Sequence, residues 1–164
     1  PPRPGETDGD DYLFLSAEKF EEKSRAGEFL EEALVHGYRY GTLKSTVLQS
    51  IEQGRDVLMD IDVQGAALVR VCPDPRVRDA LVDIFMMTAS FAELEQRLRR
   101  RGTETEDQIR FRLATAREEM KYCKEYRYLL ISGSTEEDLE KFHGIMTAER
   151  CRMSRWEFKE GENL

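Results

Sequence analysis

Seven arginines crowd into residues 97–117, and only three acidic residues lie in the same stretch. The stretch therefore carries an excess of four positive charges in a chain whose net charge is −8. Arginine binds phosphate oxygens through paired N–H groups, which suits such a cluster to phosphate chemistry. Arg97 and Arg101 are four residues apart and share a helix face, and Gly102 follows as a hinge. The pattern predicts either a lid that closes over a phosphate or two solvated helices joined by surface ion pairs.

Two aspartates, Asp60 and Asp62, end the nearly continuous apolar run of residues 56–62. Such a run is typical of a strand buried on both faces of a parallel sheet. Ligands of open α/β sheets bind at the carboxyl ends of strands, and nucleotide-binding proteins hold Mg²⁺ there with an aspartate. The alternative is that these acids only cap the following turn, and on these residues alone that interpretation is favoured.

A third group combines aromatic, acidic and small residues near the start of the chain: Arg3, Tyr12, Glu31, Tyr40, Gly41 and Thr42. A carboxylate at a base edge accepts hydrogen bonds from guanine N1–H and the 2-amine, whereas adenine has a lone pair at N1 and no amine. A buried polar group left unpaired costs roughly 1–3 kcal/mol, so such a site rejects the wrong base. Tyrosine hydroxyls and arginine would hold a phosphate. The alternative, favoured on these residues alone, is that both tyrosines are strand aromatics in a small core.

Alternating helical and strand patterns would position these groups. We expect strands near 12–15, 56–62, 82–87 and 128–131, an antiparallel hairpin within 28–42, helices near 17–26, 44–53, 91–101, 106–120 and 135–150, and an apolar helix that follows Gly65. Ser16, Ser90 and Thr105 are the expected N-caps of three of these helices. The alternation predicts an α/β fold with a parallel sheet, to which the hairpin adds a subdomain.

Composition narrows the function classes. A chain of 164 residues corresponds to one domain, and no apolar run approaches the ~20 residues that cross a membrane. The net charge of −8 argues against a nucleic acid polymer as partner. Three widely spaced cysteines (72, 123 and 151) argue against a disulfide framework or zinc site and fit a reducing, cytoplasmic location. With only two histidines, a histidine-based metal site or Ser-His-Asp triad is poorly supported.

In order and spacing, a series of short strings resembles the guanylate kinase family. The strings are R-P-G-E (3–6), D-Y-L-F-L-S (11–16), E-F-L-E (28–31), Y-G-T (40–42), D-V-L-M-D-I-D-V-Q-G (56–65), L-E-Q-R-L-R-R-R-G-T-E-T-E (94–106) and F-R-L-A-T-A (111–116). The resemblance implies a P-loop kinase-type three-layer fold with a parallel core sheet, a small mixed-sheet GMP-binding insert and a helical lid. It also implies transfer of the γ-phosphoryl group of ATP to GMP, with Mg²⁺.

The resemblance further implies a role for each matching residue. Arg3, Tyr12 and Tyr40 would clamp the GMP phosphate, Glu31 and Asp62 would read guanine beside Gly41 and Thr42, Asp60 would lie near the Mg²⁺-bound phosphates, and Arg97, Arg101 and Arg112 would close over the transferring phosphoryl group. The single domain (1–164) would comprise a GMP-binding subdomain (3–55), a core (56–96 and 118–152), a lid (97–117) and a tail (153–164).

The chain departs from the family pattern at two places. The family's phosphate loop, G-x-x-x-x-G-K-[ST], and the first core strand are absent from these residues, and Leu43 stands where the nearest similar string would need glycine. Ser132-Gly133-Ser134 replaces an asparagine followed by acids, which affects the contact to the ATP base. We therefore expect weak GMP binding without turnover from these residues alone, and either low stability or a homodimer that covers the sheet edge.

The missing loop leaves a rival interpretation open. The chain would then be a guanylate kinase-like binding module that recognises a phosphorylated peptide. Retention of the arginines at 97, 101 and 112 favours the enzyme, because a peptide-binding scaffold has no use for lid arginines.

Overall fold

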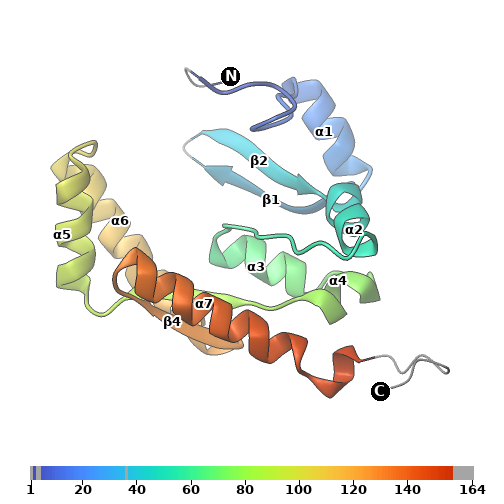
Figure 1. Cartoon of the computed structure of the whole chain (residues 1–164). Helices are drawn as coiled ribbons and strands as arrows, with labels where there is room; N and C mark the ends of the chain where they lie inside the picture. Colours follow the sequence, from blue (N-terminus) through green and yellow to red (C-terminus); the bar gives the residue numbers. More distant parts are fainter. Residues whose placement is uncertain (1, 3–4, 36, 157–164) are drawn as a thin grey trace. The chain divides into compact units, whose positions relative to one another are not determined.

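The structure, a computed structural model, describes residue 2, residues 5–35 and residues 37–156 (Figure 1). The chain divides into two compact units, residues 1–81 and 82–164. The first contains α1 (Ala17–Arg25), β1 (Phe29–Val35), β2 (Tyr38–Leu43), α2 (Lys44–Glu52), α3 (Val63–Arg70) and α4 (Pro75–Ala80). The second contains β3 (Ile84–Thr88), α5 (Phe91–Arg101), α6 (Glu106–Glu119), the 3-10 helix η1 (Met120–Glu125), β4 (Tyr128–Ser132), α7 (Thr135–Arg150) and the 3-10 helix η2 (Met153–Arg155).

The first unit is built on an antiparallel hairpin of β1 and β2, as the sequence predicts. A register irregularity between Phe29 and Glu31 sets Glu31 opposite Thr42. A mixed sheet, with both parallel and antiparallel neighbours, was expected for this insert. Among the described residues the sheet consists of β1 and β2 alone, and they are antiparallel. The register matters because directly opposite side chains on one sheet face lie close enough to interact.

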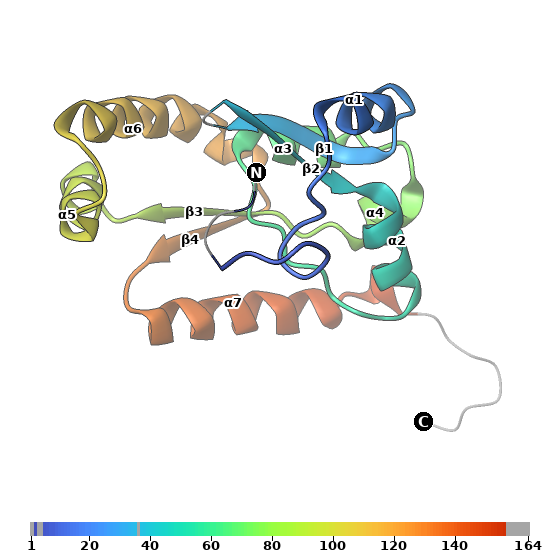
Figure 2. The ribbon, with the colours of Figure 1, turned by 90° about the horizontal axis from the view of Figure 1, so that it is seen from above.

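An apolar core fixes the hairpin against the helices of the first unit. It consists of Leu30, Val47, Val69, Cys72 and Val77, which come from β1, α2, α3, the residues after α3 and α4. Figures 1 and 2 both show α3 running beside the hairpin. Removing apolar surface from water is the main force that holds such elements together, so α3 and β1 form a fixed pair.

The second unit contains the predicted parallel sheet, reduced to β3 and β4. The two strands pair in register from Ile84 with Tyr128 to Thr88 with Ser132. A parallel pair needs a long crossover, and α5, α6 and η1 supply it. Helix α7 then runs beside β4 (Figure 2). The carboxyl end of β4 therefore leads directly into the turn before α7.

Side-chain caps start the helices where the sequence predicts them. Ser16, Ser90 and Thr105 each accept a hydrogen bond from the backbone N–H three residues later. Gly102 ends α5 in the left-handed region, with a φ of 67°, which glycine adopts without steric strain. None of the helices in the described part of the chain has the length and apolar character that crossing a bilayer requires.

The predicted strand over residues 56–62 is wrong. The segment before α3 has no regular secondary structure and no ladder partner among the described residues. Met59 and Ile61 pack against the core of the first unit, whereas Leu58 is 80% exposed. The apolar run therefore marks a segment that packs along one side, and the sequence pattern alone does not supply the neighbouring strand that a sheet needs.

The predicted strand over residues 12–15 is also wrong. Tyr12 makes one isolated bridge with Asp8, and its carbonyl accepts from Gly9 N at 2.8 Å. The Asp8 carboxylate accepts from Phe14 N at 2.8 Å. These local bonds close a turn, because a short side-chain acceptor competes with strand pairing for the same backbone groups.

Candidate functional site

Glu31 is the buried polar centre of the first unit. Its side chain lies on β1 and is 7% exposed. Thr42 Oγ1, directly across the hairpin, donates to Glu31 Oε1 at 2.6 Å. A buried carboxylate needs donors to offset its lost hydration, and the second oxygen, Oε2, has none among the described residues. The site thus holds one acceptor oriented by the fold and still open.

Asp62 and Gly65 bring the start of α3 to this carboxylate. Asp62 is the N-cap of α3, and its Oδ1 accepts from Gly65 N at 2.8 Å. A Cβ atom placed on Gly65 would lie 3.2 Å from Glu31 Oε2 and 3.4 Å from Asp62 Oδ1. Asp62 therefore caps the turn into α3, which was the alternative to a ligand-binding role. The same cap holds Asp62 close to Glu31. Of the predicted guanine readers, the structure brings together Glu31, Thr42 and Asp62.

The predicted phosphate clamps are only partly gathered. The rings of Tyr12 and Tyr40 meet edge to face, with centroids 6.0 Å apart. Neither hydroxyl has a hydrogen-bond partner among the described residues, and Arg3 lies outside them. At Gly41 a Cβ would lie 2.9 Å from Phe29 Cδ1, so glycine there permits the ring to pack across the hairpin.

Asp60 is exposed and lies in the segment before α3 that has no regular secondary structure. Within the described residues, no group of three or more histidine, cysteine, aspartate or glutamate side chains could hold a metal ion. Asp60 therefore offers a single carboxylate, which suits an ion that keeps most of its water and phosphate ligands.

Arg97, on α5, is bound to the turn between β4 and α7. Its Nη1 donates to Ser132 Oγ at 2.8 Å, and its Nη2 donates to Glu93 Oε1 at 2.6 Å. Nη2 also lies 3.3 Å from the Ser132 carbonyl oxygen and 3.1 Å from that of Gly133. The predicted catalytic guanidinium is therefore occupied by acceptors of its own unit.

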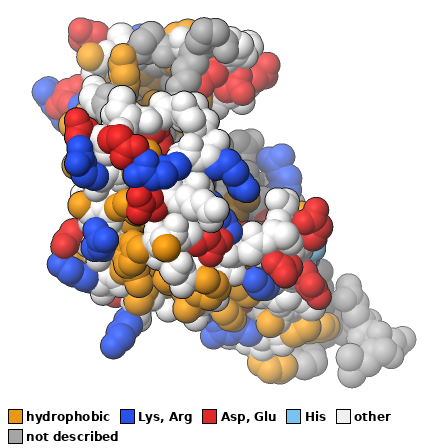
Figure 3. All heavy atoms as spheres, turned by 90° about the vertical axis from the view of Figure 1, so that its left-hand side faces the viewer, with side chains coloured by type: hydrophobic (Ala, Val, Ile, Leu, Met, Phe, Trp, Pro, Cys, Tyr) orange, Lys and Arg blue, Asp and Glu red, His pale blue; other side chains and the backbone are white. Residues whose placement is uncertain are grey.

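The other arginines of α5 and α6 differ in how they are paired. Arg112 Nε lies 2.8 Å from Glu104 Oε1. Arg99 contacts Glu106 and Glu95, and hydrogen bonding to those two carboxylates raises the pKa of Arg99. Arg101 is exposed and has no ion-pair partner among the described residues. On the face shown in Figure 3, basic side chains (blue) alternate with acidic ones (red), which agrees with the surface-pair alternative.

Asp138, at the start of α7, is a polar residue beside the turn between β4 and α7 that the sequence patterns did not predict. Ser132 Oγ donates to Asp138 Oδ2 at 2.7 Å, and Gly133 N donates to Oδ1 at 2.8 Å. Chiefly through the Gly133 bond, and then through Ser132, these contacts lower the pKa of Asp138. Its place in the acidic first turn of α7, after Ser132-Gly133-Ser134, was the available signal.

Glu149, near the end of α7, is a second residue that the sequence patterns did not predict, and it is 3% exposed. Tyr128 Oη donates to it at 2.7 Å, and Arg152 and Arg155 contact it at 3.1–3.3 Å. Burial acts to raise the pKa of Glu149, but the bonds from Tyr128, Arg152 and Arg155 outweigh it and lower the pKa to about 2. The spacing of one acid and two arginines three residues apart was the available signal.

Known proteins resemble the chain over nearly its whole length. A family model described as guanylate kinase matches residues 1–149. The guanylate kinase of Syntrophotalea carbinolica is 46% identical over 156 residues, which cover 94% of this chain and 71% of that protein. That of Maricaulis maris is 44% identical over 155 residues, 94% of this chain and 69% of that protein. The crystal structure of guanylate kinase from Anaplasma phagocytophilum superposes with a TM-score of 0.73 at 30% identity, covering 94% of this chain and 73% of that one.

Proposed function

Because this chain belongs to the guanylate kinase family and is a nucleoside monophosphate kinase, we propose that its first unit selects GMP through the buried carboxylate of Glu31. The observation that carries this assignment is the pairing at that carboxylate: Thr42 occupies Oε1 and leaves Oε2 open beside Asp62. The mixed α/β fold predicted from the sequence is confirmed.

Guanine fits the free acceptors of this site, and adenine does not. Guanine offers donors at N1 and at the 2-amine, which match Glu31 Oε2 and Asp62. Adenine would set the lone pair of its N1 against a carboxylate oxygen, leaving a partly buried acceptor unpaired at a cost of roughly 1–3 kcal/mol. Selection against the wrong base is therefore strong, because both acceptors are held by the fold before the ligand arrives.

We propose that the phosphate of GMP lies near the hydroxyls of Tyr12 and Tyr40, with Arg3 as a third clamp. Both hydroxyls lack partners among the described residues, so each could donate to a phosphate oxygen. ATP would carry Mg²⁺ to the site, with Asp60 near the ion or its waters. Bound Mg²⁺ bridges phosphate oxygens and neutralises their charge.

We assign Arg97, Arg101 and Arg112 to the phosphoryl group in transfer. Phosphoryl transfer needs little covalent help, and fixed positive charge on the equatorial oxygens supplies most of the stabilisation. Arg101, unpaired among the described residues, is the arginine most available for this role.

Three further assignments accompany the site. A lid at 97–117, a GMP-binding subdomain at 3–55, a core at 56–96 and 118–152 and a tail at 153–164 are proposed subdivisions of the domain. A cytoplasmic location is supported by the three free thiols, Cys72, Cys123 and Cys151. A homodimer stays a prediction.

Calorimetric titration of the chain with GMP, IMP, AMP and a phosphoserine peptide tests the base assignment. We expect binding in the order GMP, IMP, AMP, and we expect Glu31→Gln to weaken GMP by roughly 10-fold to 100-fold because one acceptor becomes a donor. The matched control is Glu32→Gln, whose carboxylate accepts from Ser24 Oγ; it should leave GMP affinity unchanged. Guanine preference that survives Glu31→Gln, or tighter binding of the peptide than of GMP, would contradict the proposal.

A further inference from the structure

Gly65, in the first turn of α3, lies against the acidic side chains that we assign to guanine. We propose that Gly65 is a specificity-determining residue: its missing side chain leaves the opening through which a guanine edge reaches Glu31 and Asp62. This inference rests on the proposed function and adds a residue that contributes no polar side-chain group.

The space at Gly65 is shared by the two acidic side chains. A Cβ atom there would lie 3.2 Å from Glu31 Oε2 and 3.4 Å from Asp62 Oδ1. One methyl group would therefore contact both oxygens at once, at or within ordinary van der Waals distance. Polar donors would no longer approach either oxygen from that side, and the closer one, Oε2, would have to move.

Glu31 has little freedom to move away from such a methyl group. Its carboxylate is held by the 2.6 Å bond from Thr42 Oγ1, and its side chain is 7% exposed. The other close neighbour of the new Cβ would be Ile61 Cβ at 3.3 Å, whose side chain packs on the core of the first unit. The strain would therefore fall mainly on the orientation of the Glu31 carboxylate.

Backbone geometry does not explain this glycine. Gly65 is not among the glycines with positive φ, and it lies inside a helix, where glycine is less favourable than alanine. Helix propensity and backbone conformation therefore both permit alanine, and helix propensity favours it. What excludes a side chain is the space beside Glu31 and Asp62.

The experiment compares Gly65→Ala with Gly144→Ala. Gly144 is a helical glycine in α7 whose Cβ would meet nothing within 4 Å. Each variant of the chain is melted and titrated with GMP and with IMP, which lacks the 2-amine. We expect Gly144→Ala to raise the melting temperature without changing either affinity. We expect Gly65→Ala to fold with an unchanged or higher melting temperature and to lose about tenfold in GMP affinity, with a smaller GMP-to-IMP ratio.

A double variant identifies the origin of the loss. Shortening the acid in Gly65→Ala/Glu31→Asp withdraws the carboxylate from the new methyl group, so part of the GMP-to-IMP ratio should return. Failure of Gly65→Ala to fold, or an equal loss of GMP and IMP affinity with a lower melting temperature, would show a packing role and overturn the inference. An unchanged ratio would overturn it as well. A ratio that Glu31→Gln leaves unchanged, or no measurable GMP binding by the wild-type chain, would instead overturn the guanine site itself.

Discussion

The two units hold their candidate site groups in opposite ways. In the first unit, Glu31 is buried, yet only one of its two oxygens has a donor among the described residues. In the second unit, Arg97 contacts four acceptors of its own unit, and Arg112 pairs with Glu104. The first unit thus presents an acceptor that is ready for a ligand, whereas in the second unit Arg97 and Arg112 are donors that are already engaged.

The difference indicates how each part acts. In the proposed site, a base would bind Glu31 without displacing any internal partner, so recognition would depend on positions set during folding. A phosphate can reach Arg97 only by replacing Glu93 and the Ser132 and Gly133 contacts. The ion pair with Glu93 adds little to the cost of that replacement, because Arg97 and Glu93 are each 32% exposed and partly exposed ion pairs contribute about 0–1 kcal/mol. We therefore propose that Arg97 and Arg112 stay paired at rest and exchange partners when a more highly charged anion arrives.

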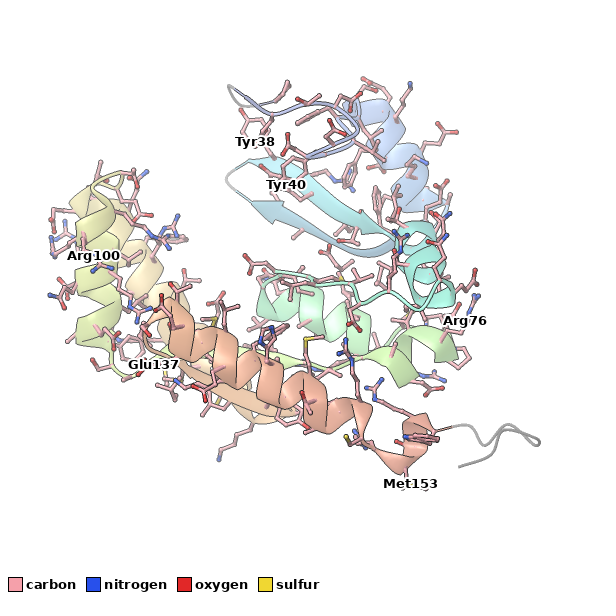
Figure 4. The ribbon with its side chains drawn as sticks, viewed as in Figure 1. Tyr38, Tyr40, Arg76, Arg100, Glu137 and Met153 are labelled. Atoms are coloured by element: carbon pink, nitrogen blue, oxygen red, sulfur yellow. The ribbon has the colours of Figure 1, made fainter. Side chains whose placement is uncertain are left out.

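Arg101 gives the sharpest test of this contrast, because it is the assigned catalytic arginine without an internal partner. Since no turnover is expected from these residues alone, the phosphate-loop segment of a guanylate kinase relative is joined in front of them for this test. In that protein Arg101→Ala should lower kcat for GMP phosphorylation by roughly 10³-fold or more while leaving the GMP dissociation constant unchanged. Steady-state kinetics and GMP titration measure the two quantities separately. The control is Arg100→Ala, one residue away on α5 (Figure 4), which should keep kcat within a few-fold. Equal losses in both variants would assign the effect to the general charge of the helix.

Glu149 tests whether the arginines of the second unit serve structure where their pairs are buried. Glu149→Gln should lower the free energy of unfolding by about 2 kcal/mol at pH 7, since hydrogen bonds to a buried charge are stronger than neutral ones. The folded-state pKa of about 2 lies below the ordinary 4.5. The carboxylate therefore stabilises the fold above pH 4.5, and this stabilisation is lost as the pH falls from 4.5 towards 2.

Urea denaturation between pH 2 and pH 7 measures this dependence. The difference between wild type and Glu149→Gln should shrink through the window from pH 4.5 to pH 2. Glu140→Gln, on an exposed position of α7, is the matched control and should change the free energy of unfolding at pH 7 by less than about 0.5 kcal/mol. A constant difference at every pH would mean that shape, and not charge, accounts for the loss.

The sequence predicts best what local chemistry decides. Ser16, Ser90 and Thr105 begin helices as expected, because a cap depends on residues three positions apart. The segment over residues 56–62 was misassigned because a strand requires a partner that no local pattern encodes. The guanine-reading roles of Glu31 and Asp62 follow from the family resemblance, because the spacing of these residues along the chain does not predict them. Gly65 escaped notice because its role lies in a space between elements distant in sequence.

Thr42 is expected to show the smallest effect, and it separates site orientation from fold stability. Thr42→Val keeps the shape and strand propensity of the side chain but removes the hydroxyl that donates to Glu31 Oε1. GMP affinity should fall about fivefold, or ~1 kcal/mol, because the carboxylate loses its fixed direction. Thr88→Val is the matched change in the second unit, where Thr88 Oγ1 donates to the Ser90 carbonyl oxygen at 2.9 Å. Both variants should lose similar stability on denaturation, but only Thr42→Val should weaken GMP. If Thr88→Val weakens GMP as much, the loss follows general stability, and the preset acceptor of the first unit no longer distinguishes the two units.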